Sequence, residues 1–216
     1  MKTELVMILD RSGSMSGLES DTIGGYNAML EKQKKEPGEV RVTTVLFDDR
    51  IEVLHDRREL RRVKPLNDRQ YYVRGCTALL DAVGFAIRKI VEAQRFAAPD
   101  ERADKVVFVI TTDGYENASR EYSYEQVKQM VELEKEKYGW EFLFLGANID
   151  AVSVAGRFGI APERAVNYHA DGAGTQLNYR VVSDTVCAFR TGAPISADWK
   201  RDIERDFRTR KTAGRR

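Results

Sequence analysis

The sequence predicts an α/β protein with a doubly wound, mostly parallel sheet, one antiparallel edge strand and helices on both faces. Strand-like apolar runs alternate with helix-like amphipathic segments along most of the 216 residues, an order that is typical of βαβ units. Two consecutive strand-like runs depart from this alternation, and the residues Asp48-Asp49-Arg50 between them indicate a hairpin. The second hairpin strand is therefore expected to be antiparallel and to lie at a sheet edge.

The first half of the chain opens with an apolar strand and contains the hairpin. The first helix can be capped by Ser20 or Asp21, and Pro37-Gly38 lies beyond its end. Gly24 and Gly25 lie inside this helix at a cost of about 1 kcal/mol each relative to Ala, which indicates close packing. The predicted elements are, in order, a strand at 4–9, a helix at 21–35, strands at 40–47 and 51–54, and a helix at 77–96.

The second half contains the most apolar run of the chain, Lys105 to Gly114. Its lack of polar–apolar alternation predicts a central parallel strand that helices cover on both faces. Gly139 is expected to end the amphipathic helix that follows. The remaining predicted elements are a helix at 124–138, a strand at 140–145, a helix at 150–158, a strand at 165–168 and a helix at 176–189.

The composition is that of a globular protein, with 42% hydrophobic and 32% charged residues, and it suits one domain at 1–192. The formal net charge of +1 predicts no general attraction to nucleic acid or to an anionic membrane. No apolar run is long enough to span a membrane. Cys76 and Cys187 follow no metal or redox spacing and, with the lack of a signal-peptide pattern, favour a cytoplasmic protein.

Residues 193–216 are expected to form a basic C-terminal tail. From Asp198 on, basic side chains alternate with four acidic ones, a pattern that favours a solvated, fraying helix. A weak contact with a polyanion such as nucleic acid is the alternative. The basic residues are Lys200, Arg201, Arg205, Arg208, Arg210, Lys211, Arg215 and Arg216.

Three segments carry polar side chains to the predicted carboxyl edge of the sheet. Asp10 ends the first strand, Asp113 ends the most apolar strand, and Thr77 follows Gly75-Cys76 at the start of a helix. In open α/β sheets, ligands bind beyond the carboxyl ends of the strands, where the strand order reverses. If the two strands are central neighbours, the two aspartates face one another across that crevice.

The assembled set contains only oxygen donors. An all-oxygen set with two carboxylates and several hydroxyls suits a hard cation, with Mg²⁺ preferred and Mn²⁺ or Ca²⁺ as alternatives. A loop that passes a metal turns alternate side chains inward, and neutral hydroxyls leave the cation electrophilic. Such a cation is expected to bind an anionic oxygen from outside, most simply an Asp or Glu carboxylate of a protein partner. The predicted metal ligands are Asp10, Ser12, Ser14, Thr77 and Asp113.

These motifs resemble the von Willebrand factor type A domain and its metal-ion-dependent adhesion site. The resemblance rests on Leu9–Met15, "LDRSGSM", on Thr77 and on "TTDG" at Thr111–Gly114. These motifs occur in the family's order, each at the predicted end of the matching element. The resemblance extends over residues 3–190. It implies a Rossmann-like fold, with the three hydroxyls as direct or near-direct ligands and the two aspartates often acting through water. It further implies a binding module of the bacterial intracellular type, which works in a multi-protein assembly and often beside an ATPase.

A rim of residues is expected to surround the metal and to contact the partner. These residues are Arg11, Met15, Arg74, Tyr115, Glu116 and Asn117. The sequence indicates no catalytic residue, because it has no G-x-S-x-G motif and neither His55 nor His169 has a ligand-spaced neighbour. A phosphoesterase that uses Asp10 as nucleophile stays an alternative, although such enzymes resemble D-x-D and Ser12 stands at the second position here.

Overall fold

The computed structural model of the chain describes residues 1–213, with side chains through Arg210. The side chain of Lys211 and the residues Arg215 and Arg216 of the predicted basic tail lie outside the described part. No helix in the described part is both long and apolar enough to span a membrane.

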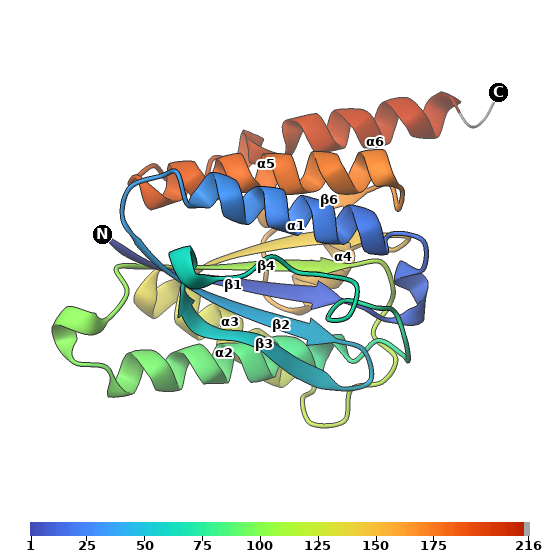
Figure 1. The fold of residues 1–216 in the computed structure, drawn as a ribbon. Helices are drawn as coiled ribbons and strands as arrows, with labels where there is room; N and C mark the ends of the chain where they lie inside the picture. The colour runs from blue at the N-terminus through green and yellow to red at the C-terminus, as the bar shows by residue number, and fades with distance from the viewer. Residues whose placement is uncertain (214–216) are drawn as a thin grey trace.

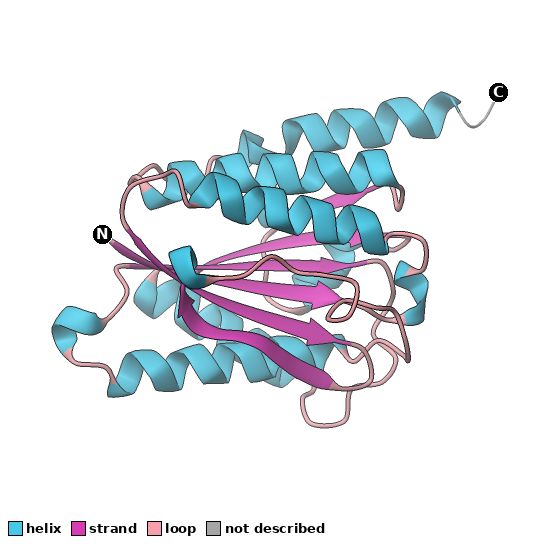
Figure 2. Cartoon of the chain, viewed as in Figure 1, coloured by secondary structure: helices cyan, strands magenta, loops and turns pink. Residues whose placement is uncertain are grey.

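Six strands form one sheet in the order β3-β2-β1-β4-β5-β6. All neighbouring pairs are parallel except β2 and β3, which form the predicted antiparallel hairpin at one edge. Figures 1 and 2 show the strands fanning across the centre of the molecule with helices on both sides. The strands are β1 (Lys2–Asp10), β2 (Glu39–Phe47), β3 (Ile51–Glu59), β4 (Lys105–Thr112), β5 (Glu141–Ala147) and β6 (Ala165–Tyr168).

The helices divide between the two faces of the sheet, and alternate residues of β1 follow the same division. Leu5, Met7 and Leu9 pack in one apolar cluster with side chains of α1 and α5, while Val6 and Ile8 pack in the other with α2, α3 and α4. Both faces of β1 are therefore buried, as expected for a central parallel strand. The helices are α1 (Glu19–Gln33), α2 (Leu79–Phe96), α3 (Tyr124–Tyr138), α4 (Ala151–Arg157), α5 (Gly172–Arg190) and α6 (Arg201–Ala213).

The order of the strands reverses between β1 and β4, and this pairing places the predicted site. Leu9 of β1 lies opposite Thr111 of β4 in parallel register. Asp10 and Asp113 therefore follow neighbouring strands at the same sheet edge, as the sequence predicts. The chain leaves β1 in one direction and β4 in the other, which creates the crevice typical of such switch points.

Helix α3 has the predicted bounds because both of its ends carry strong signals. Ser123 and Gln126 form a reciprocal capping box, in which each side chain accepts from the other residue's backbone N–H. At the other end Gly139 adopts the left-handed conformation, with φ of 65°.

Several element boundaries differ from the sequence predictions, among them the start of α2 at Leu79 rather than at residue 77, and three have a clear local reason. Helix α1 begins at Glu19 and its N-cap is Leu18 rather than Ser20 or Asp21, because the turn after β1 runs directly into the helix. Strand β3 continues to Glu59, past the predicted end at residue 54, through register shifts and a positive φ of 43° at Arg57. Helix α5 starts at Gly172, where the Asp171 carboxylate accepts the Gly174 N–H.

The last described segment also differs from the predicted solvated helix, since one side of α6 is buried. Ile203 is 1% exposed and belongs to the apolar cluster of α1 and α5, and Trp199 packs against the same cluster. The ring of Phe207 packs against His169 in a tilted arrangement, with 4.7 Å between the ring centroids. The spacing Trp199, Ile203, Phe207 is an amphipathic signal that the many charges obscure. The end of the domain at residue 192 stays a prediction.

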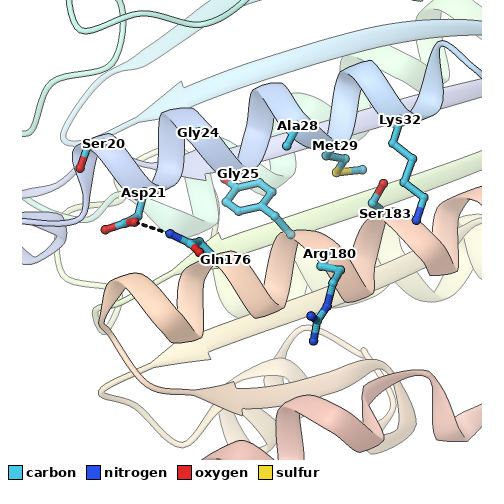
Figure 3. Close-up of a pocket in the computed structure, with 11 residues that line it drawn as sticks. Ser20, Asp21, Gly24, Gly25, Ala28, Met29, Lys32, Gln176, Arg180 and Ser183 are labelled. Carbon is cyan, nitrogen blue, oxygen red and sulfur yellow. Dashed lines mark hydrogen bonds between the residues drawn. The ribbon is translucent and has the colours of Figure 1, made fainter.

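Helices α1 and α5 approach one another closely at Gly25, as the glycine pair in α1 predicts. A Cβ at Gly25 would lie 2.3 Å from the Tyr179 ring, whereas one at Gly24 would have no neighbour within 4 Å. Figure 3 shows the groove between these helices, with a hydrogen bond of 3.1 Å from Gln176 to Asp21 across it.

Candidate metal site

The loop after β1 is held by the carboxylate of Asp10, which is 1% exposed. Its Oδ1 accepts the backbone N–H of Ser12 at 2.7 Å, and its Oδ2 accepts the hydroxyl of Thr112 at 2.6 Å. The carbonyl of Asp10 accepts the hydroxyl of Tyr71. Asp10 thus ties together the end of β1, the loop and the end of β4, and both carboxylate oxygens have partners.

Three hydroxyls meet beside this carboxylate, as predicted. Ser12 Oγ and Ser14 Oγ lie 2.9 Å apart, and Thr77 Oγ1 donates to Ser12 Oγ at 3.0 Å. They belong to two segments that backbone bonds hold in contact, since the Gly13 N–H donates to the Gly75 carbonyl at 3.2 Å. The alternation of Ser12 and Ser14 therefore brings two side chains to one side of the loop.

Asp113 completes the set from β4. Its Oδ1 is buried without a hydrogen-bond partner among the described residues, while Oδ2 accepts from Asn148 Nδ2 at 3.4 Å. A Cβ at the next residue, Gly114, would lie 3.1 Å from Ser14 Oγ and 3.3 Å from Thr77 Oγ1. The structure thus brings all five predicted ligands together, with Gly114 allowing the close approach.

The electrostatics of the site suit a cation. Burial raises the pKa of Asp10, and it also raises the pKa of Asp113, with the nearby Asp10 charge adding to the shift. Two ionised carboxylates at a buried site without a positive partner are costly. A hard cation fits because its charge compensates both carboxylates and because the donor set is all oxygen. In the described part of the chain no three His, Cys, Asp or Glu residues cluster, so the hydroxyls are needed to complete any site here.

Two of the predicted rim residues are buried, so the prediction that they face a partner is wrong. Met15 is 2% exposed and lines the protein interior. Arg11 is 0% exposed, and its Nε donates to the equally buried Asp48 at 2.9 Å while Nη1 lies 2.8 Å from Glu52. The reason is the same alternation that turns Ser12 and Ser14 toward the site, because Arg11 and Met15, which flank the two serines in the sequence, point elsewhere.

Glu116 and Asn117 lie near the site, but their side chains bond to the backbone. Glu116 Oε2 accepts the Leu80 N–H at 2.9 Å in the first turn of α2, where a negative charge is favoured. Asn117 Oδ1 accepts the Thr77 N–H at 2.9 Å, and the Asn117 N–H donates to the Thr77 carbonyl. Asn117 therefore fixes the position of Thr77, while Glu116 holds the first turn of α2.

Of the rim residues, Tyr115 and Asn117 are exposed and Arg74 is partly exposed. Tyr115 is 57% exposed. The partly exposed Arg74 donates from Nε to Asp48 at 2.7 Å, and its guanidinium lies over the ring of Tyr72. The side chains of Tyr115 and Arg74 flank the site on opposite segments.

Three residues near the site lie outside the sequence prediction. Thr112 and Tyr71 bond to Asp10, and Asn148 approaches Asp113 from the end of β5 with φ of 54°. Thr112 lies in the quoted "TTDG", and Asn148 follows a strand that ends at the same sheet edge, so both had a sequence signal. Tyr71 had none, because it comes from a loop whose path the sequence does not reveal.

No protein-family model matches the chain, and no curated protein matches its sequence. Solved structures do match its fold. The von Willebrand factor domain of the type V pili tip protein Mfa5 from Porphyromonas gingivalis matches with a TM-score of 0.59 and 10% identity, over 90% of this chain and 98% of that one.

A second match is proximal thread matrix protein 1 from the mussel byssus, in a structure whose metal-ion-dependent adhesion site motif holds zinc. Its TM-score is 0.58 at 15% identity, over 86% of this chain. This chain spans 46% of that protein. A mutant of the minor pilin PilB from Streptococcus sanguinis matches with a TM-score of 0.58 and 12% identity, over 90% of this chain and 64% of that one. The chain therefore has the Rossmann-like fold of a von Willebrand factor type A domain.

Proposed function

We propose that this chain is a metal-dependent protein-binding module and not an enzyme. One observation carries the proposal: three hydroxyls and two buried carboxylates from three separate segments meet where the strand order reverses. The proposed ligands are Asp10, Ser12, Ser14, Thr77 and Asp113, and Mg²⁺ is the proposed ion. When bound, the cation supplies an electrophilic position that an anionic oxygen from outside can fill.

The two carboxylates have different parts in this proposal. Both oxygens of Asp10 already accept hydrogen bonds, so Asp10 anchors the loop and adds negative charge. Asp113 Oδ1 has no partner in the described chain and is the carboxylate oxygen available to the cation or its water. The hydroxyls of Ser12, Ser14 and Thr77 are neutral, so they add no negative charge and leave a divalent ion here more electrophilic than further carboxylates would.

The proposed partner is a protein that offers an Asp or Glu carboxylate. The matches to a pilus tip protein and to a thread matrix protein support a role in protein assemblies. A multi-protein assembly with an ATPase in the cytoplasm is the further proposal, and it rests on the sequence resemblance alone.

Metal binding is tested by isothermal titration with Mg²⁺ and Mn²⁺ on a matched pair of variants. Ser14→Ala removes a proposed ligand, whereas Ser16→Ala removes an exposed hydroxyl in the same loop. We expect Ser14→Ala to weaken binding about tenfold or more, an effect of the size that loss of a metal-supporting group produces, and Ser16→Ala to bind as wild type does. Equal binding by the two variants, or no binding by wild type, would reject the metal site.

Partner capture is tested by affinity purification in Mg²⁺ and, in parallel, in EDTA. The partner should be retained in Mg²⁺ and released by EDTA, and Asp113→Asn should fail to capture it in either buffer. A partner that stays bound in EDTA would show that the interaction does not need the metal.

Two alternative functions have direct tests. A phosphoesterase would hydrolyse phosphate esters in a manner that depends on Asp10, and we expect no turnover with Mg²⁺ present. Nucleic-acid binding through α6 would be salt-dependent and would weaken when the exposed Arg201 and Arg205 become Glu. These substitutions are preferable to deletion of residues 198–216, because Ile203 packs in the core.

A further inference from the structure

A small cavity lies beneath the metal loop, between the sheet and the helices α1 and α5. Val109 of β4, Leu145 of β5 and Tyr168 of β6 form its floor, and Met15 of the loop closes it toward the metal site. Tyr179 lines both this cavity and the outer groove shown in Figure 3. The cavity thus lies inside the joint between the two helices.

Four polar side chains that line this cavity each have a buried oxygen without a geometric hydrogen bond in the described chain. Thr22 of α1 and Thr175, Asn178 and Tyr179 of α5 are 2%, 4%, 4% and 6% exposed. Within the described part of the chain, Thr22 Oγ1, Thr175 Oγ1, Asn178 Oδ1 and Tyr179 Oη all lack a hydrogen bond. They belong to two helices and lie in the wall of a single cavity.

Such a cluster is unusual, because the large majority of buried side-chain polar atoms in proteins have a hydrogen-bond partner, either protein or ordered water. Each unpaired group loses its bonds to water on folding and gains nothing in return. A partner shared by the four groups removes this cost at once. Asn178 Oδ1 can only accept, while the three hydroxyls can donate or accept, so the partner must itself donate.

We propose that the cavity binds an internal water molecule, which bridges α1 and α5 through these four side chains. The space open to the centre of a water-sized sphere is about 10 Å³, which is room for one water. The four oxygens are neutral, so the site suits a neutral ligand rather than a cation. Internal waters make about three hydrogen bonds to groups that are otherwise unpaired, as this site allows.

The water site is independent of the proposed metal function, because none of its four polar residues is a proposed ligand. It explains why α5 keeps polar residues on the face that packs against the sheet. Asn178, near the middle of the cluster, is the single obligate acceptor and therefore the residue whose loss changes the site most.

The direct test is a crystal structure of the wild-type chain that shows ordered water. We expect one density peak at hydrogen-bond distance, about 2.7–3.2 Å, from at least three of the four oxygens. An empty cavity, direct bonds among the four side chains, or a cation at about 2.4 Å would each overturn the proposal.

Solution NMR gives a second test through cross-relaxation between long-lived water and the methyl groups of Thr175 and Val182. We expect the signal in wild type and in Arg180→Gln, a change at an exposed position of the same helix. We expect it to disappear in Asn178→Leu, which replaces the acceptor with an apolar group of similar size. A signal unchanged in folded Asn178→Leu, or absent in wild type, would contradict the assignment.

Discussion

Buried charge is compensated in different ways at two places in the molecule, the C-terminus of α1 at the amino end of the sheet and the metal site at its carboxyl end. At the amino end, the guanidinium of Arg190, 4% exposed, lies at the C-terminus of α1. Its Nη1 donates to the Gln33 carbonyl and to Gln33 Oε1, both at 2.8 Å, and its Nη2 donates to the Pro37 carbonyl at 3.1 Å. At the carboxyl end, two buried carboxylates lie together and Asp113 Oδ1 has no partner in the described chain.

The difference separates stability from binding. Helix C-termini leave carbonyls without partners, and Arg190 supplies donors for them, so its burial is compensated inside the chain. The two carboxylates of the metal site have no positive partner among the described side chains, so a cation from outside would compensate them, whereas Asp48 at the same sheet edge pairs with Arg11 and Arg74. Strained or unpaired polar groups of this kind gather at functional sites. We therefore expect substitution of Arg190 to lower the free energy of unfolding without changing Mg²⁺ binding. Substitution of a metal-site carboxylate should weaken Mg²⁺ binding and raise the stability of the metal-free protein.

The largest effect is expected at the amino end, from Arg190→Met. The substitution keeps much of the side chain's apolar volume but removes the guanidinium donors to the Gln33 and Pro37 carbonyls. We expect a loss of about 2–4 kcal/mol in the free energy of unfolding, from unpaired buried groups. Urea denaturation measures this loss, and Mg²⁺ affinity should stay as in wild type. A change in Mg²⁺ affinity of tenfold or more would break the proposed separation of the two ends.

The second effect lies between the two ends, where α1 meets α5. Gly25→Ala places a Cβ 2.3 Å from the Tyr179 ring, which overpacks the joint at a cost of about 1–3 kcal/mol. Gly24→Ala meets nothing within 4 Å and should stabilise the helix by about 1 kcal/mol. Thermal denaturation of the two variants should thus show shifts of opposite sign. Equal shifts would mean that the helices are not in contact at Gly25.

The third effect sharpens the comparison at the carboxyl end. Asp113→Asn removes one of two buried negative charges, so the metal-free protein should gain about 1 kcal/mol in stability. The same variant should lose the increase in melting temperature that Mg²⁺ gives to wild type, because ligand binding stabilises only a competent site. Thermal scans with and without Mg²⁺ measure both changes. A metal-free variant less stable than wild type would show that Asp113 is structural.

The sequence predicts the site better than it predicts the edges of the elements. Asp10, Thr77 and Asp113 follow strong strand or helix signals, and parallel strands bring their ends together whatever the loops do. Burial of Arg11 was not predictable in the same way, because it depends on Asp48, which the chain brings near from the hairpin turn 37 residues away. Tyr71 and Arg190 likewise act over long sequence separations that no local pattern encodes. In α6, charge density hides the apolar spacing of Ile203 and Phe207.

The smallest effect concerns a charge at the carboxyl end that, unlike those of the metal site, has its partner within the chain. Partial burial alone would raise the pKa of Asp171, but the Gly174 N–H and the Arg210 guanidinium outweigh it and hold the pKa below its ordinary value. The folded state therefore binds this proton less readily than the unfolded state, so the contribution is present above the ordinary pKa of an aspartate and is lost as the pH falls through the lowered one. Asp171→Asn should flatten the acid side of the stability–pH profile, as measured by urea denaturation from pH 6 down to about pH 3. The control is Asp184→Asn, which alters an exposed ion pair between Asp184 of α5 and Lys32 of α1. It should leave that slope closer to wild type, because solvent screens the pair. An unchanged slope in Asp171→Asn would mean that the ion pair with Arg210 does not hold α6 against the start of α5.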